Sequence, residues 1–109
     1  MTTESVIAHH LEAFMSGDVD EIMSDYAEDA VVFHPEGTAK GTTEIRSLIE
    51  SLLTLLAPLI PNFEMVRQDS HGDVMYLAWK SGDAAPLGTD TFVVQNDKIV
   101  AQTVTAYIA

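Results

Sequence analysis

Three ionisable residues stand in stretches of the sequence that are otherwise apolar. His34 ends an apolar run and directly precedes Pro35, Asp90 lies within the mainly apolar run 87–94, and His10 shares a helical face with apolar residues. An imidazole titrates at about pH 6.5, so it can accept and donate a proton in a cell. A carboxylate among apolar side chains is either paired with an imidazole or held protonated. Together these residues would suit an acid/base site that moves protons.

Each of the three residues also has a purely structural interpretation. His34 and His10 could be core residues whose rings are satisfied by hydrogen bonds within the protein. Asp90 could be a strand-end residue that reaches water. The three side chains would also supply a metal site of two histidines and one carboxylate. No His-x-His or His-x3-His spacing supports that site, so we expect no metal and no cofactor.

Composition excludes several classes of function. The chain has 109 residues, a net charge of −12 and 5 basic residues, which argues against binding nucleic acid or anionic membrane surfaces. A 47% hydrophobic content is enough to build a core. The absence of cysteine and of a signal-peptide pattern at the start of the chain predicts a cytoplasmic protein. The length predicts one domain.

The elements that must position these residues follow from apolar spacing. Helical periodicity predicts three helices: one closed by Gly17, one capped by Asp18, and one capped by Thr42 or Thr43 and ended by Pro58 and Pro61. A strand is predicted for 30–34. Two hairpins are predicted, pairing 63–69 with 74–80 and 87–95 with 99–108, the second with Asn96-Asp97 at its turn. Helices followed by hairpins indicate an α+β fold with an antiparallel sheet.

This order of elements resembles the SnoaL-like polyketide cyclases and ketosteroid isomerases, which share the nuclear-transport-factor-two-like, or cystatin-like, fold. The segments that carry the likeness are AFMSGDVDEIMSDYAEDAVVFHPEG at 13–37, KGTTEIRSLIESL at 40–52 and GTDTFVVQNDKIV at 88–100. The resemblance implies a single domain over 1–109, in which a cone-shaped curved sheet packs around three N-terminal helices. It also implies an apolar cavity for a small hydrophobic molecule, and a homodimer through the outer face of the sheet.

The resemblance also places the candidate catalytic residues. Ketosteroid isomerases use an Asp base before a proline at the end of the first strand, where this chain has His34. Their tyrosine on the first helix corresponds to His10, and their donor Asp corresponds to Asp90. Only one of the three positions keeps its residue type, while SnoaL-like cyclases place His and Asp groups in the same cavity. We therefore expect His34, Asp90 and His10 to share one cavity, with His34 within hydrogen-bond reach of Asp90 directly or through one water.

Two functions remain open on the sequence alone. The first is an isomerase, cyclase or dehydratase that acts on a small carbonyl compound, with His34 as proton shuttle and Asp90 as orienting or donor group. The alternative is a non-catalytic ligand-binding or dimerisation domain of the same fold. The expected ligand-binding side chains are Phe14, Tyr26, Tyr76 and Phe92. Trp79, on the opposite strand phase from Tyr76, is expected on the outer face, where it would anchor a dimer partner.

Overall fold

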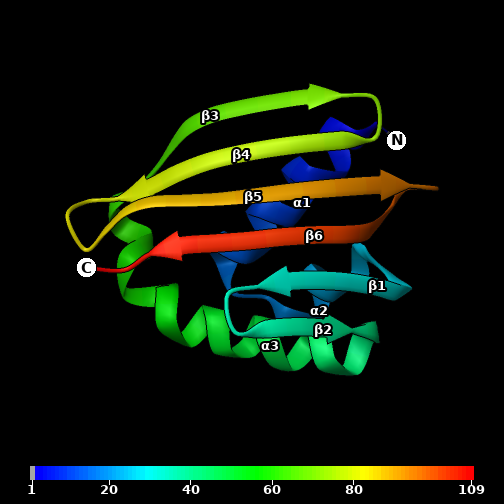
Figure 1. The fold of residues 1–109 in the computed structure, drawn as a ribbon, viewed down its shortest axis with the longest axis horizontal. Coiled ribbons are helices and arrows are strands. Elements are labelled where there is room, and N and C mark those ends of the chain that lie inside the picture. The colour runs from blue at the N-terminus through cyan, green and yellow to red at the C-terminus, as the bar shows by residue number, and fades with distance from the viewer. Residues whose placement is uncertain (1) are drawn as a thin grey trace.

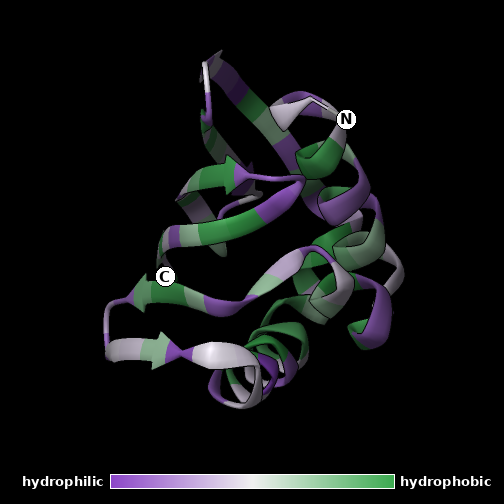
Figure 2. Cartoon of the chain, turned by 90° about the vertical axis from the view of Figure 1, so that its right-hand side faces the viewer, coloured by the Kyte–Doolittle hydropathy of each residue, from purple (hydrophilic) through white to green (hydrophobic). Residues whose placement is uncertain are grey.

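A computed structural model describes residues 2–109 as helices packed on one face of a curved sheet (Figures 1 and 2). The helices are α1 (Thr3–Ser16), α2 (Val19–Ser24), α3 (Gly41–Leu56) and the 3-10 helix η1 (Ala57–Asn62). The strands are β1 (Tyr26–His34), β2 (Gly37–Lys40), β3 (Phe63–His71), β4 (Val74–Ser81), β5 (Ala85–Gln95) and β6 (Lys98–Tyr107). This is the predicted α+β class, with the N-terminal helices packed against a curved sheet that does not close into a barrel.

The strand order is β2-β1-β6-β5-β4-β3, and every neighbouring pair is antiparallel except β1 and β6, which run parallel. The order therefore places β1, from the first third of the chain, beside the C-terminal strand. The expectation of a wholly antiparallel sheet is wrong at this one pair. Helix α3 packs across β1 and β2, so the segment 26–56 covers one end of the sheet with its own helix (Figure 1).

Local signals set the helix ends and the second hairpin turn. Gly17 closes α1 with a left-handed φ of 73°, which glycine adopts without steric penalty. The Asp18 side chain accepts a hydrogen bond from the Glu21 backbone N–H at 3.2 Å and caps α2. Asn96 and Asp97 both have positive φ in the turn between β5 and β6, as a tight two-residue hairpin requires. These predictions are confirmed.

Other boundaries differ from the prediction. The N-cap of α3 is Lys40 rather than Thr42 or Thr43, the helix begins at Gly41, and the Lys40 side chain makes no capping hydrogen bond. Strand β1 starts at Tyr26 rather than residue 30, and the four-residue strand β2 was not predicted. Pairing between His34 and Gly37 closes the β1–β2 hairpin. Proline at 58 and 61 ends α3, as expected, and the chain continues as the 3-10 helix η1.

The hydrophobic core lies between the helices and the inner face of the sheet. Ile7, Ile22, Ile45, Leu77 and Ile99 are completely buried. Side chains of α1, α2 and α3 that fall at helical spacing supply one wall, and alternate residues of the strands supply the other. No helix in the described part of the chain is both long and apolar enough to cross a membrane.

Candidate functional site

A cavity lies between the helices and the inner face of the sheet. The space open to the centre of a water molecule is about 80 Å³, several times the ~10–15 Å³ that one water requires. Residues from α1, α3, η1 and strands β3 to β6 line it. Most are apolar, and the polar contributors are His10, Trp79, Ser81, Asp90 and Gln102. The cavity therefore has room for a small organic molecule against an apolar wall with one polar corner.

Asp90 is the carboxylate of that polar corner. In the β-ladder Asp90 pairs with Leu77 on β4 and Val104 on β6, both buried. The Trp79 indole N–H donates to Asp90 Oδ2 at 2.9 Å, and the Gln102 side-chain amide donates to Oδ1 at 3.0 Å. Both donors are neutral, so the described structure gives this carboxylate hydrogen bonds without an ion pair.

The surroundings of Asp90 shift its protonation equilibrium. Burial of the carboxyl group is the largest influence and raises its pKa above the ordinary value of 3.8. The hydrogen bonds from Trp79 and Gln102, and the charge of His10, act in the opposite direction without cancelling it. The residue is partly exposed because it faces an open cavity, while the carboxyl group itself lies deep among protein atoms. Asp90 thus takes up and releases a proton closer to neutral pH than an exposed aspartate does.

Behind the cavity, Gln102 leads into a chain of buried polar side chains. The Tyr26 hydroxyl donates to Gln102 Oε1 and lies 3.4 Å from His10 Nε2. The His10 ring meets the rings of Tyr26 and Phe92 edge-on, at centroid distances of 5.2 and 5.5 Å. Burial raises the pKa of the Tyr26 hydroxyl, and the negative charges of Asp90 and Asp25 raise it further, so this group stays protonated.

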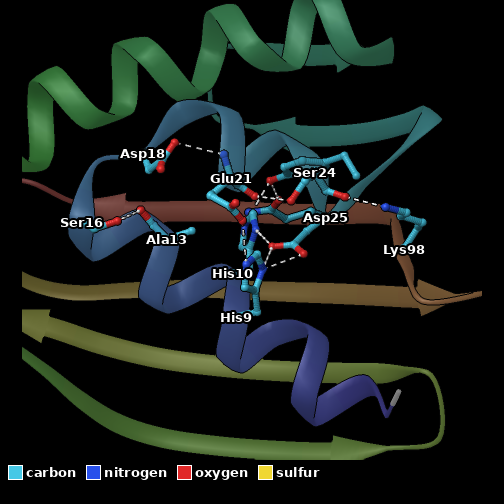
Figure 3. A network of polar contacts seen from close by, with 11 residues as sticks. His9, His10, Ala13, Ser16, Asp18, Glu21, Ser24, Asp25 and Lys98 are labelled. Carbon is cyan, nitrogen blue, oxygen red and sulfur yellow. Dashed lines mark hydrogen bonds and ion pairs between the residues drawn. The ribbon is translucent and has the colours of Figure 1, made fainter.

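The series of polar side-chain contacts continues from His10 to the protein surface, as Figure 3 shows. His10 Nδ1 lies 3.3 Å from Asp25 Oδ2, and His9 Nδ1 lies 2.8 Å from the same oxygen. His9 Nε2 in turn contacts Glu21 Oε2 at 2.9 Å. Burial raises the pKa of Asp25, but hydrogen bonds from His10 and His9 outweigh it, so the net pKa is lowered. The hydrogen bond to Asp25, its charge and the contact with Glu21 raise the pKa of His9.

The structure brings two of the three predicted catalytic residues to the cavity. Asp90 and His10 both line it. His34 does not, so its expected place in the cavity is wrong, and the hydrogen bonds that Asp90 accepts come from Trp79 and Gln102 rather than from His34. The predicted strand phase is right, because His34 is two residues from the buried Val32. However, His34 sits at the closing pair of the β1–β2 hairpin, which lies outside the cavity wall.

The predicted ligand-binding residues divide in the same way. Phe14 and Phe92 line the cavity, whereas Tyr26 lies behind it in the buried polar chain. The expected phase of β4 is wrong. Tyr76 is 36% exposed on the outer face, while Trp79 is 6% exposed and lines the cavity. The strand carries aromatic residues on both faces, so alternation alone could not tell which face is inside.

Several residues of the site were missed by reading the sequence. Gln102 shares its strand phase with Val104, so it is a polar residue among inward-facing apolar ones, the same signal that identified Asp90. Asp25 and His9 gave no comparable signal, because they follow or flank helical stripes at positions that usually face water. Within residues 2–109, no group of three His, Asp or Glu side chains is arranged to hold a metal ion.

Comparisons with known proteins bear on the fold and the family. The SnoaL-like domain family matches residues 7–102. No curated protein matches the sequence. Similar solved structures include a SnoaL-like protein of unknown function from Burkholderia thailandensis, at 17% identity and TM-score 0.79, covering 96% of this chain and 94% of that one. At these low identities the structural likeness establishes the fold alone.

Two further structures carry names that suggest an activity. One is a candidate polyketide cyclase from Sinorhizobium meliloti, with 15% identity, TM-score 0.78, and coverage of 95% of this chain and 99% of that one. The other is a candidate ketosteroid isomerase from Kribbella flavida, with 14% identity, TM-score 0.74, and coverage of 98% and 78%. Both share the curved sheet and helices described above.

Proposed function

The chain belongs to the SnoaL-like domain family, and we propose that it is an acid/base enzyme of isomerase, cyclase or dehydratase type that acts on a small uncharged carbonyl compound. The observation that supports this proposal is the position of Asp90, a buried carboxylate with a raised pKa on the wall of an apolar cavity. A titratable group perturbed in this way and facing a cleft is a candidate for proton transfer. The candidate polyketide cyclase and ketosteroid isomerase of the same fold agree with this class of reaction.

In the proposed reaction, Asp90 moves a proton on the carbon next to the carbonyl group. The ionised carboxylate accepts that proton, the C–H electron pair forms a carbon–carbon double bond, the π pair of the carbonyl moves to its oxygen, and an enolate forms beside a neutral Asp90. The proton then returns to the same or another carbon as the enolate collapses, so no co-reactant is consumed. Trp79 and Gln102 hold the carboxylate in place during both steps. His10 lies behind them and contacts the Tyr26 hydroxyl, which donates to Gln102. We assign the proton transfer to Asp90 rather than to His34.

The walls of the cavity define which ligands it admits. No lysine or arginine is among the residues that line it in the described structure, and the chain carries a net charge of −12. An anionic ligand would meet a buried carboxylate with no lysine or arginine to offset it, which is unfavourable in a poorly solvated site. The proposed substrates are therefore neutral, apolar and small. Carboxylates and phosphate esters are excluded from this proposal.

The alternative is a non-catalytic binding site, which the same geometry also supports. Both oxygens of Asp90 already accept hydrogen bonds from the protein, so the carboxylate could serve only to complete the buried polar chain. Ligand binding in the cavity and proton transfer to the bound ligand can be measured separately. Trp79 is the one tryptophan in the sequence and it lines the cavity, so its fluorescence reports ligand binding. Incorporation of deuterium into a bound ketone from D₂O, followed by NMR, reports proton transfer.

The experiment is a titration of small uncharged ketones, such as 2-tetralone and cyclohexanone, with both readouts. The proposed enzyme gives saturable fluorescence changes and deuterium incorporation that also saturates with ketone concentration. Binding without incorporation would support the non-catalytic alternative and contradict the enzyme. A bicyclic carboxylate, 2-naphthoate, is the control ligand and should leave Trp79 fluorescence unchanged.

Assembly through the outer face of the sheet is a separate proposal. Leu87 and Tyr107 are paired across β5 and β6 and are 53% and 64% exposed. Exposed apolar side chains that adjoin one another are favourable sites for association. A homodimer that uses this face would sediment at twice the mass of the 11.9 kDa chain, and replacing Tyr107 with lysine should return it to monomers. Sedimentation of the unmodified chain as a monomer at micromolar concentration would contradict it.

A further inference from the structure

Polar side chains buried in this small core are concentrated in one chain of contacts. The buried polar or charged residues of the described structure are His10, Asp25, Ser81 and Gln102, each at most 7% exposed. All except Ser81 belong to the series of contacting polar side chains that extends from Asp90 through Gln102, Tyr26 and His10 to Asp25. Burying so many polar groups is unfavourable unless each finds a partner, and in this chain each does. A structure selected for stability alone would favour apolar residues at these positions.

The direction of the hydrogen bonds along this chain is set by its two carboxylates. Asp25 has a lowered pKa and is therefore an acceptor, which places a proton on His10 Nδ1. At the other end, Asp90 accepts from the Gln102 side-chain nitrogen. The Gln102 side-chain oxygen must then face Tyr26, and it accepts from the Tyr26 hydroxyl. If the amide were reversed, its oxygen would face the Asp90 carboxylate and its N–H₂ would face the Tyr26 proton.

We infer that Gln102, held in one orientation by Tyr26, is a positioning residue that keeps the Asp90 carboxylate oriented and favours its ionised form. The inference rests on the proposed role of Asp90 in proton transfer. Its test reads the ionisation of Asp90 itself, however, so the inference and the proposed function can fail separately. Besides the direct effect of the His10 charge on Asp90, Tyr26 and Gln102 connect the buried His10–Asp25 pair to Asp90 by hydrogen bonds.

Few other groups can influence the ionisation of Asp90. His10 on α1 and Tyr26 at the start of β1 are the titratable groups whose charge or polarity reaches it, and Asp25 acts on Tyr26 from the end of α2. Neighbours on β4 and β6, Trp79 and Gln102, are neutral donors. The cavity-lining residues of α3, η1 and β3 are apolar: Ile49, Leu52, Leu56, Leu59, Ile60 and Phe63. A change at Gln102 or Tyr26 should therefore be visible at Asp90 without interference from a second carboxylate in the cavity.

The test is a pH titration of the Asp90 carboxyl carbon by NMR in protein labelled with ¹³C-aspartate, with the signal assigned by its loss in Asp90→Asn. Gln102→Leu removes the donor and should move the midpoint of the Asp90 titration upward by about one pH unit. Tyr26→Phe removes a single oxygen and frees the amide, so it should move the midpoint in the same direction by a smaller amount. Gln102→Glu places a second carboxylate beside Asp90 and should give the largest upward shift.

Tyr107→Phe is the matched control, because it removes the same hydroxyl from an exposed tyrosine on β6, and it should leave the midpoint unchanged. Circular dichroism and the dispersion of the NMR spectrum establish that each variant is folded. The inference is overturned if folded Gln102→Leu and Tyr26→Phe both titrate at Asp90 as the unmodified protein does. A purely structural role of the buried chain would lower stability in these variants and leave that midpoint where it was.

Discussion

The Trp79 indole lies directly against the backbone of Gly88, the residue with which it pairs in the β4–β5 ladder. A Cβ atom at position 88 would stand 2.2 Å from the nearest carbon of the indole ring, far closer than two carbon atoms can approach. Because the same indole donates to Asp90, the absence of a side chain at Gly88 allows the polar corner of the cavity to form.

Gly88→Ala should therefore displace the indole and disturb Asp90. We expect a loss of about 1–3 kcal/mol in the free energy of unfolding, typical of overpacking a buried site, and a change in Trp79 fluorescence. Urea denaturation measures the first. The double-mutant cycle with Trp79→Leu is the control: once the indole is gone, the alanine should have little effect. An equal loss in both backgrounds would show that the indole is not what the methyl group meets.

Asp25→Asn should destabilise the protein at neutral pH, because it removes a buried charged acceptor shared by His9 and His10. The expected loss is about 1–3 kcal/mol. The folded-state pKa of Asp25 is lowered below 3.8, so its contribution is present above that pH and disappears as the pH falls through the folded value. Urea denaturation as a function of pH should show the two proteins converging in that acidic range. The exposed Asp73, replaced by asparagine, is the control and should not change stability.

His9 should add stability with the opposite dependence on pH. Its pKa is raised above 6.5 in the folded protein, so the contribution is complete below 6.5 and is lost as the pH rises through the folded value. His9→Asn should therefore be less stable than the unmodified protein at about pH 5.5 and nearly equal to it at about pH 9. His71→Asn, at an exposed position in β3, is the control substitution and should change the free energy of unfolding little. A His9→Asn profile parallel to that of the unmodified protein would show that the histidine is not coupled to Asp25.

Elements with strong local signals were predictable from the sequence. The Gly17-Asp18 junction and the Asn96-Asp97 turn each carry backbone requirements that few other residues meet, so their places in the fold followed directly. Asp90 was identifiable because a carboxylate in an inward strand phase is rare. Its strand phase predicted the inner face of the sheet, and Asp90 lies on that face in the structure.

The rest depended on contacts between distant segments. His34 was expected inside because strand phase fixes which face a residue occupies, but phase does not fix how far along the sheet the cavity extends. Trp79 was assigned to the wrong face since β4 has aromatic residues in both phases, and only its contacts with Gly88 and Phe63 distinguish them. The contacts of His9 and Asp25 join α1 to the end of α2 across 16 residues, and no local pattern marks such a pair.

The most direct test of Asp90 as the proton-transfer group compares deuterium incorporation into 2-tetralone by the unmodified protein, by Asp90→Asn and by Asp73→Asn. General acid/base groups contribute about 10²–10⁴-fold to rate, so Asp90→Asn should lose at least about 100-fold of the catalysed exchange while Trp79 fluorescence still reports binding. Asp73→Asn should exchange at the unmodified rate. Retention of full exchange by a folded Asp90→Asn protein would contradict the account, because proton transfer would then not require the carboxylate in the cavity.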